Sequence, residues 1–168
     1  MVVGKNINIV AKIILKYKTM KFIHYGNDSF KKELFKNVQN SIFPDRKPKV
    51  GGLWASPLNS EFGWKQWCNE QKFRDCEINN SFVFELKEGS NILIIDKKED
   101  TKNMCPILEY YKDRKHYDIL GYDFEKTSTK YDAVLLTNEG QKETHYIGGG
   151  LIWDCECILV LNVKCIKI

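Results

Sequence analysis

The chain has 168 residues, which is long enough for one domain to bury a hydrophobic core without metal or disulfide cross-links. Its 26 basic and 22 acidic residues give a formal net charge of +4 and are spread along the sequence. That excess is too small to indicate nucleic acid as a partner. No apolar run is long enough for a membrane-spanning helix, which excludes an integral helical membrane protein.

The N-terminal sequence and the cysteines indicate the cellular compartment in which the protein is expected. Lys12 and Lys16 interrupt the apolar run of residues 1–19 before it reaches the ~7–15 residues of a secretory signal core. We therefore expect a cytoplasmic protein with reduced, mostly buried thiols. Cys155 and Cys157 are spaced C-x-C, whereas zinc sites favour C-x2-C pairs, so no metal is expected. Residues 1–19 are interpreted as a peripheral extension, and residues 20–168 as a single domain.

In chain order, the first element is a strand over residues 21–25, KFIHY, followed by a turn at residues 26–28. Apolar residues recur at helical spacing through residues 29–40 and predict a helix there. A glycine-led strand, GGLWAS, covers residues 51–56. It is followed by a short aromatic helix within residues 61–73, EFGWKQWCNEQKF.

The second half begins with two strands, residues 81–87 and 91–96, joined by a turn at residues 88–90. A helix is predicted over about residues 100–118, a strand over 131–137, a turn at 138–140 and a terminal strand over 155–163. Strands outnumber helices and do not alternate regularly with them. The pattern favours an α+β fold with a mostly antiparallel sheet and a few short flanking helices.

Two residues near glycines are candidates for chemistry. His24 lies in the first strand just before a glycine turn, although a half-buried histidine is often simply hydrogen-bonded. Trp54 follows Gly51 and Gly52, and a large ring beside bare backbone offers a slot in which a planar group can stack. The plain alternative is that Trp54 is a core residue.

Glu156 is harder to explain as a structural residue. It stands at the head of the apolar run CILVLNV, and period-two alternation places it on one face with Ile158, with Asp154 on that face as well. Carboxylates facing an apolar side are costly unless they are hydrogen-bonded or used in chemistry. The alternative is that the core begins at Ile158 and Glu156 stays in water.

Three short motifs thus occur in order: FIHYG with His24, GGLWASP with Trp54, and WDCECILVLN with Glu156. The arrangement resembles the ADP-ribosyltransferases of the diphtheria-toxin and poly(ADP-ribose) polymerase branch. Their signature is a histidine in an early strand, an aromatic residue in a glycine-led strand and a glutamate opening a late strand. The resemblance runs through residues 20–168, with Tyr25 inserted after His24 and Trp54 in place of the customary tyrosine.

The resemblance implies an ADP-ribosyltransferase-like split sheet and NAD as substrate. It implies that Glu156 stabilises positive charge on the ribose, which is a transition-state role. It also implies that His24 binds a ribose hydroxyl of the adenosine half and that the backbone of Tyr25 binds the carboxamide. The nicotinamide ring would then lie beside Gly52 and stack on Trp54, and Trp64 or Trp67 would cover its other face.

Asp154 occupies the position where arginine-modifying relatives carry a glutamate or glutamine that orients the acceptor. It is one methylene shorter, and the second motif has no Ser-Thr-Ser strand, so arginine is not supported as the acceptor. The residues leave open a protein side chain, a nucleic-acid group or water.

Three other functions remain open. RNA 2′-phosphotransferases that use NAD rely on clustered arginines, whereas Arg46, Arg74 and Arg114 are far apart in this sequence. A binding module could recognise NAD or ADP-ribose without chemistry. A cysteine-based enzyme would need an activated thiol, and alternation points Cys155 and Cys157 away from the face of Glu156.

Overall fold

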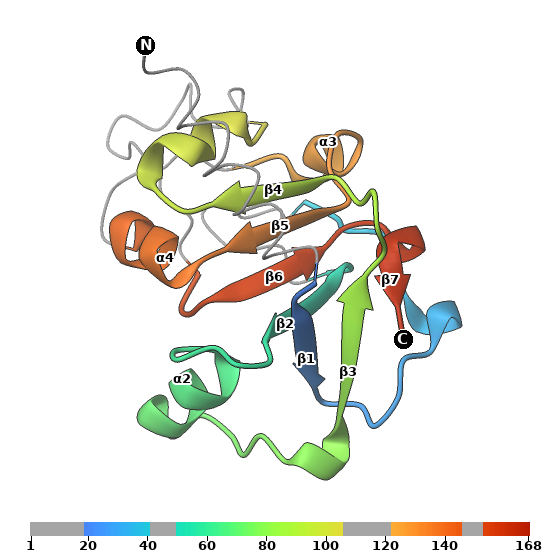
Figure 1. The fold of residues 1–168 in the computed structure, drawn as a ribbon, viewed down its shortest axis with the longest axis vertical. Coiled ribbons are helices and arrows are strands. Elements are labelled where there is room, and N and C mark those ends of the chain that lie inside the picture. Colours follow the sequence, from blue (N-terminus) through green and yellow to red (C-terminus); the bar gives the residue numbers. More distant parts are fainter. Residues whose placement is uncertain (1–18, 41–49, 106–121, 146–152) are drawn as a thin grey trace.

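The computed structural model describes residues 19–40, 50–105, 122–145 and 153–168 (Figure 1). Its strands are β1 (Lys21–Tyr25), β2 (Leu53–Pro57), β3 (Ser81–Leu86), β4 (Ile92–Ile95), β5 (Ala133–Leu136), β6 (Cys157–Val160) and β7 (Ile166–Lys167). Its α-helices are α2 (Trp64–Gln71), α3 (Phe124–Ser128) and α4 (Asn138–Thr144), and its 3-10 turns are η1 (Lys32–Leu34), η2 (Ile78–Asn80), η3 (Lys98–Asn103) and η4 (Val163–Cys165). Most of the proposed extension, residues 1–18, lies outside the described residues.

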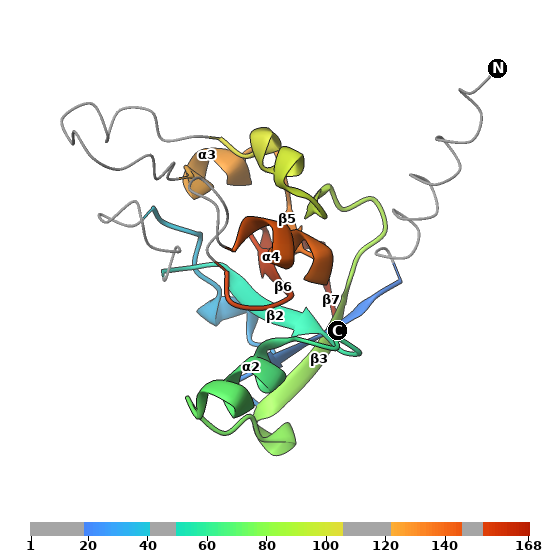
Figure 2. The same ribbon diagram turned by 90° about the vertical axis from the view of Figure 1, so that its left-hand side faces the viewer.

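The described strands form one mixed sheet in the order β4-β5-β6-β2-β1-β3-β7. Every neighbouring pair is antiparallel except β4 and β5. The predicted α+β class with a mostly antiparallel sheet is therefore confirmed. In Figure 1, β4, β5 and β6 lie across the molecule, while β1 and β3 stand steeply in it, so the sheet curls between its two halves. Figures 1 and 2 place α2 at one end of the molecule, and α3 at the other.

The sheet turns at the junction of β1 and β2. Strand β1 pairs with β2 through Phe22 and Ile23, and it follows β3 all the way to Tyr25. Beyond Ile23, the ring of His24 replaces the backbone as the partner of β2, because its Nδ1 atom lies 2.7 Å from the carbonyl oxygen of Trp54. A side chain thus satisfies a β2 carbonyl where the neighbouring strand diverges.

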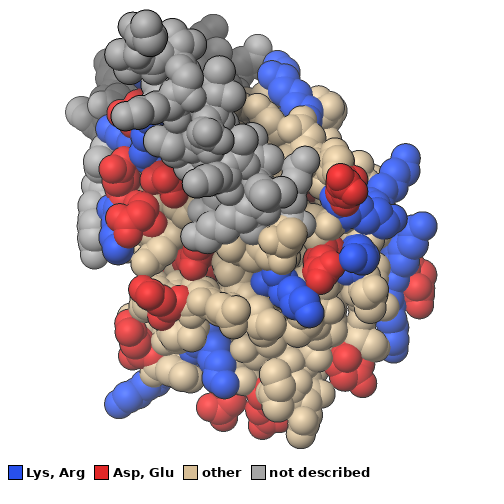
Figure 3. Space-filling view, in the orientation of Figure 1, with Lys and Arg blue, Asp and Glu red and all other residues tan. Residues whose placement is uncertain are grey.

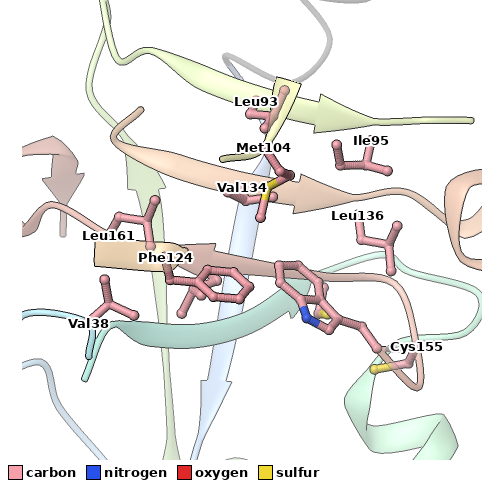
Figure 4. Close-up of a cluster of buried hydrophobic side chains, with 12 residues drawn as sticks. Val38, Leu93, Ile95, Met104, Phe124, Val134, Leu136, Cys155 and Leu161 are labelled. Carbon is pink, nitrogen blue, oxygen red and sulfur yellow. The ribbon is translucent and has the colours of Figure 1, made fainter. Parts of the chain in front are cut away.

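Two hydrophobic clusters cover the two faces of the sheet. Strand β6 serves both, since Cys157 and Leu159 belong to the first cluster, and Ile158 and Val160 to the second. Burial on both faces explains why its sequence is continuously apolar. Figure 4 shows the first cluster, where Met104 lies near Leu93 of β4 and Val134 of β5, and Phe124 lies near Leu161. The first cluster also contains Val38, Ile95, Leu136, Trp153 and Cys155.

The predicted helix over residues 29–40 is wrong, because the segment contains only the short turn η1. Its backbone instead forms hydrogen bonds with the residues just before β2. The N–H of Gly52 donates to the Lys36 carbonyl at 2.8 Å, and the N–H of Gln39 donates to the Val50 carbonyl at 3.0 Å. Leu34, one of the apolar residues behind the prediction, is 65% exposed. Tertiary hydrogen bonds have outweighed helical periodicity here.

Two further predictions need correction. Residues 138–140 begin helix α4 and do not form an isolated turn, since Thr137 accepts a hydrogen bond from the Gly140 N–H and caps the helix. In the predicted helix 100–118, the described part is the 3-10 turn η3, and residues 106–121 lie outside the described part of the chain. The terminal strand is shorter than predicted, because β6 is Cys157–Val160.

The cysteines are as predicted. All six lie among the described residues, all are buried, and none forms a disulfide. Across the described segments, no helix has the length and apolar character needed to cross a membrane.

Gly51 has a structural reason to be glycine. Its φ is +74°, and a Cβ atom at this position would lie 1.9 Å from the carbonyl oxygen of Asn37. The group that comes close to Gly51 is therefore the protein's own backbone. Gly140 is similar, since a Cβ there would lie 2.0 Å from the carbonyl oxygen of Ile95 and would push α4 away from β4.

We predict that Gly51→Ala destabilises the protein much more than Gly89→Ala. Both positions have a positive φ, but nothing lies within 4 Å of a Cβ at Gly89. Gly89→Ala should therefore cost only the backbone strain, about 1 kcal/mol. Gly51→Ala adds a collision with backbone and should cost about 3 kcal/mol or more. Urea midpoints measure the difference, and equal losses would contradict the close approach.

Candidate functional site

His24 is half-buried at the end of β1. Because a carbonyl oxygen only accepts hydrogen bonds, the 2.7 Å contact to Trp54 places a proton on Nδ1. Nε2 is then an acceptor, and the side-chain nitrogen of Asn27 lies 3.3 Å from it. Burial lowers the pKa of His24, and the positive charge of Arg74 lowers it further, while the Trp54 hydrogen bond opposes both. This arrangement favours a neutral imidazole of one tautomer.

The indole of Trp54 lies on the other side of the sheet from His24. It packs against the first hydrophobic cluster, with its ring 4.7 Å from that of Trp153 in an edge-on contact. The His24 ring instead contacts Phe82, which packs against the second cluster. The structure thus brings His24 to the backbone of Trp54 rather than to its ring.

Glu156 is half-buried in a bend one residue before β6, and its carboxylate is hydrogen-bonded. The hydroxyl of Ser60 donates to Oε2 at 2.6 Å, and the Glu156 N–H donates to the carbonyl of Phe62 at 3.0 Å. The hydroxyl of Ser56 donates to the Glu156 carbonyl at 3.1 Å. The β2–α2 connection therefore holds both the backbone and the side chain of Glu156.

His24 and Glu156 are tied to the same strand. His24 binds the carbonyl of Trp54, and Glu156 is anchored to Ser56, two residues further along β2. Two residues of a strand span about 6.6 Å. The strands that carry or follow the three motif residues are consecutive neighbours in the sheet, in the order β6-β2-β1. Their motifs lie far apart in the sequence, so the fold brings them together.

Trp64 is hydrogen-bonded through its backbone to one of these anchor points, Ser56. Its N–H donates to the Ser56 hydroxyl at 2.8 Å, and its ring stacks on that of Trp67 with centroids 5.0 Å apart and planes at 15°. The guanidinium carbon of Arg74 lies 5.7 Å from the Trp64 ring centroid. Arg74 also donates from Nη2 to the carbonyl of Tyr25 at 3.1 Å. Arg74 therefore bridges the end of β1 and helix α2.

The remaining predicted residues make contacts within the chain. A Cβ on Gly52 would lie 2.6 Å from a methyl carbon of Leu159, so close packing with β6 accounts for the glycine. Asp154 is half-buried, and its carbonyl lies 3.4 Å from the side-chain nitrogen of Gln141 on α4. It stands two residues before Glu156 in the same bend.

Sequence reasoning missed Ser56, Ser60 and Arg74. Ser56 is only 2% exposed and connects β2, α2 and Glu156. A hydroxyl in an otherwise apolar strand end was the available signal, since a buried polar group needs partners. Ser60 and Arg74 lie in loops, and their partners are distant in sequence, so no local pattern marked them.

All six cysteine thiols are buried. Cys155 and Cys157 belong to the first buried cluster, on the face that alternation predicted. Burial, followed by a hydrogen bond with Cys76, raises the pKa of the Cys68 thiol to about 12, and burial also raises that of Cys165 to about 12. These two thiols stay protonated at neutral pH. Within the described segments, no three His, Cys, Asp or Glu side chains are grouped so that they could hold a metal ion.

We predict that His24 titrates below its ordinary pKa of 6.5 in NMR spectra of the folded protein. Because the folded state disfavours the proton, this group's contribution to stability is present above pH 6.5 and is lost as pH falls through the lower folded pKa. Arg74→Met should raise the midpoint, since it removes one of the causes of the shift. A midpoint at or above 6.5 in the parent protein contradicts the buried, neutral imidazole.

A scan of family models matched none of them, and neither the search of curated proteins nor that of solved structures returned a match. The comparisons therefore supply no family for this chain. What can be said of its chemistry comes from the residues around Glu156 and His24.

Proposed function

We propose that the protein is an NAD-dependent mono-ADP-ribosyltransferase with an ADP-ribosyltransferase-like split sheet. One observation carries the proposal: the three motif strands are neighbours in the order β6-β2-β1, with His24 and Glu156 anchored two residues apart on β2. A histidine, an aromatic residue and a glutamate from distant parts of the chain would have no reason to converge in this way by composition alone.

The chemistry asked of Glu156 follows from its charge and position. When the bond between nicotinamide and C1′ of the ribose breaks, both electrons leave with nicotinamide, and positive charge develops on the sugar. A carboxylate held beside C1′ stabilises that charge more in the transition state than in the ground state. A nucleophilic atom of the acceptor then bonds to C1′ and loses its proton. The hydrogen bond from Ser60 keeps the carboxylate in one orientation.

The substrate-binding roles fall on the end of β1 and on helix α2. Neutral His24 can bind a ribose hydroxyl of the adenosine half, and the backbone of Tyr25 can hold the carboxamide. Trp54 is the expected stacking ring, but its indole makes an edge-on contact with Trp153. Trp64 also packs against the first cluster, and it differs from Trp54 because Arg74 links its ring to the end of β1. We assign the nicotinamide stack to Trp64, with Trp67 supporting it from within α2.

The proposed acceptor is a macromolecule, a protein or a nucleic acid, with Asp154 as the residue that orients it. Asp154 shares the bend with Glu156, which suits a group that must meet C1′ from beside the catalytic carboxylate. Acidic and basic side chains are interspersed on the face in Figure 3, so this face selects no single sign of charge.

The first test is nicotinamide release from NAD by the purified protein and by Glu156→Gln, with and without cell extract. We expect the variant to be slower by about 10²–10³-fold, because it keeps the size of the side chain but loses the charge. Glu139→Gln, on the exposed surface of α4, is the matched control and should behave like the parent. Release that is unaffected by Glu156→Gln would overturn the assignment. NAD binding without release would favour the binding module.

A second test addresses the support of Glu156. Ser60→Ala removes the donor to Oε2 and should lower kcat by about 3- to 10-fold with little change in KM, since one neutral-to-charged hydrogen bond is lost. Ser60→Thr keeps the hydroxyl and should restore most of kcat. Ser90→Ala, which alters a distant turn, is the control. An equal loss in the alanine and threonine variants would show that Ser60 acts through packing and not through its hydroxyl.

A further inference from the structure

Arg74 holds a positive charge at the proposed substrate site, and none of the described carboxylates forms an ion pair with it. Its side chain is exposed, and its guanidinium contacts the Tyr25 carbonyl and the ring of Trp64. Within residues 19–40, 50–105, 122–145 and 153–168, no ion pair joins it to an acidic side chain. A carbonyl and an aromatic face attract a cation but do not neutralise it.

These two contacts are the ones that the proposed function assigns to nicotinamide. The nicotinamide ring of NAD is planar and cationic, and its carboxamide carries N–H donors. The guanidinium of arginine is also planar and cationic, with N–H donors at its edge. In the unliganded protein, therefore, Arg74 lies over the ring that should stack on nicotinamide and occupies the carbonyl that should receive the carboxamide.

Arg74 is exposed, and its guanidinium lies close to the ring of His24. A Cβ built on Gly26 would lie 3.8 Å from Nε2 of His24 and 3.9 Å from Nη2 of Arg74, so both atoms border the space beside this glycine. In NAD, a diphosphate joins the adenosine ribose, assigned to His24, to the nicotinamide ribose, assigned to Glu156. Arginine binds phosphate oxygens strongly, through paired and charge-assisted hydrogen bonds.

We infer that Arg74 fills the nicotinamide position of the empty site and moves to the diphosphate when NAD enters. This inference rests on the proposed function and adds a specificity-determining residue to it. Substrates with a diphosphate can recruit Arg74 away from Tyr25 and Trp64. A nicotinamide compound without phosphate must displace Arg74 and gains no contact in return, so the residue selects the dinucleotide.

The test compares NAD with nicotinamide riboside, which has the scissile bond but no phosphate, in the parent protein and in Arg74→Met. For NAD, we expect KM to rise by about 3- to 10-fold, because the charged hydrogen bond lost with the diphosphate outweighs the gain from the freed nicotinamide position. For nicotinamide riboside, KM should fall by about 3- to 10-fold, because the occupied position becomes free. Arg74→Lys keeps the charge without the planar fork, so it should retain most of the NAD affinity and still admit the riboside.

Lys65→Met is the matched control, since it removes an exposed positive charge from the first turn of α2, next to Trp64. It should change neither KM by more than about 2-fold, which is the scale of surface electrostatics. Changes of the same sign for both substrates in Arg74→Met, or no change, would overturn the inference while Glu156→Gln still tests the proposed function. If the parent protein neither binds NAD nor releases nicotinamide, both the proposed function and this inference fail.

Discussion

The hydrogen bond from His24 to the Trp54 carbonyl is the interaction on which the arrangement of the sheet depends. Strand β2 lies in the middle of the order β6-β2-β1, and it pairs with β6 over residues 53–55 and with β1 over residues 56–57. At the point where β1 leaves, an unpaired carbonyl would be left in a half-buried setting, at a cost of about 1–3 kcal/mol. The imidazole satisfies it. A polar side chain thus allows the sheet to curl without an orphaned backbone group.

Close approach between backbone segments also stabilises other parts of the fold. Gly51 and Gly140 each face a backbone carbonyl at a distance that no side chain would allow, so the segment before β2 and helix α4 pack directly against backbone. Strand β6 is buried on both faces and separates the two hydrophobic clusters. Because Glu156 is one residue before this rigid strand, its backbone is positioned by the core and not by a free loop.

Glu156 and Arg74 show how charged groups are kept near an aromatic region without pairing with each other. The carboxylate has the Ser60 hydroxyl, and the guanidinium has the Tyr25 carbonyl and the Trp64 ring. Neither set of partners cancels the charge, so both groups stay available to an ionic ligand. Hydrogen-bonded polar networks rigidify a site when each member has a partner. Ser56, which joins Trp64 and Glu156, is the common member.

Two groups of the candidate site could be found from the sequence, because each is a polar side chain at a recognisable position relative to a strand or turn. His24 stands before a glycine turn, and Glu156 heads an apolar strand. Neither the side of the sheet on which Trp54 lies nor the partners Ser60 and Arg74 could be found in this way. These depend on which strands become neighbours, and strand pairing joins residues that are about a hundred positions apart, as with Trp54 and Leu159.

By itself, the sequence determined the elements whose signals are local. The apolar strands β1, β3 and β5 and the aromatic helix α2 lie where alternation and run length predict them, and the α+β class follows from their proportions. Only the tertiary structure decided that residues 29–40 contain no α-helix, that Thr137 starts a helix and that the sheet has the order β6-β2-β1. The physical reason is that hydrogen bonds and burial between distant segments outweigh local preferences of a few tenths of a kcal/mol per residue.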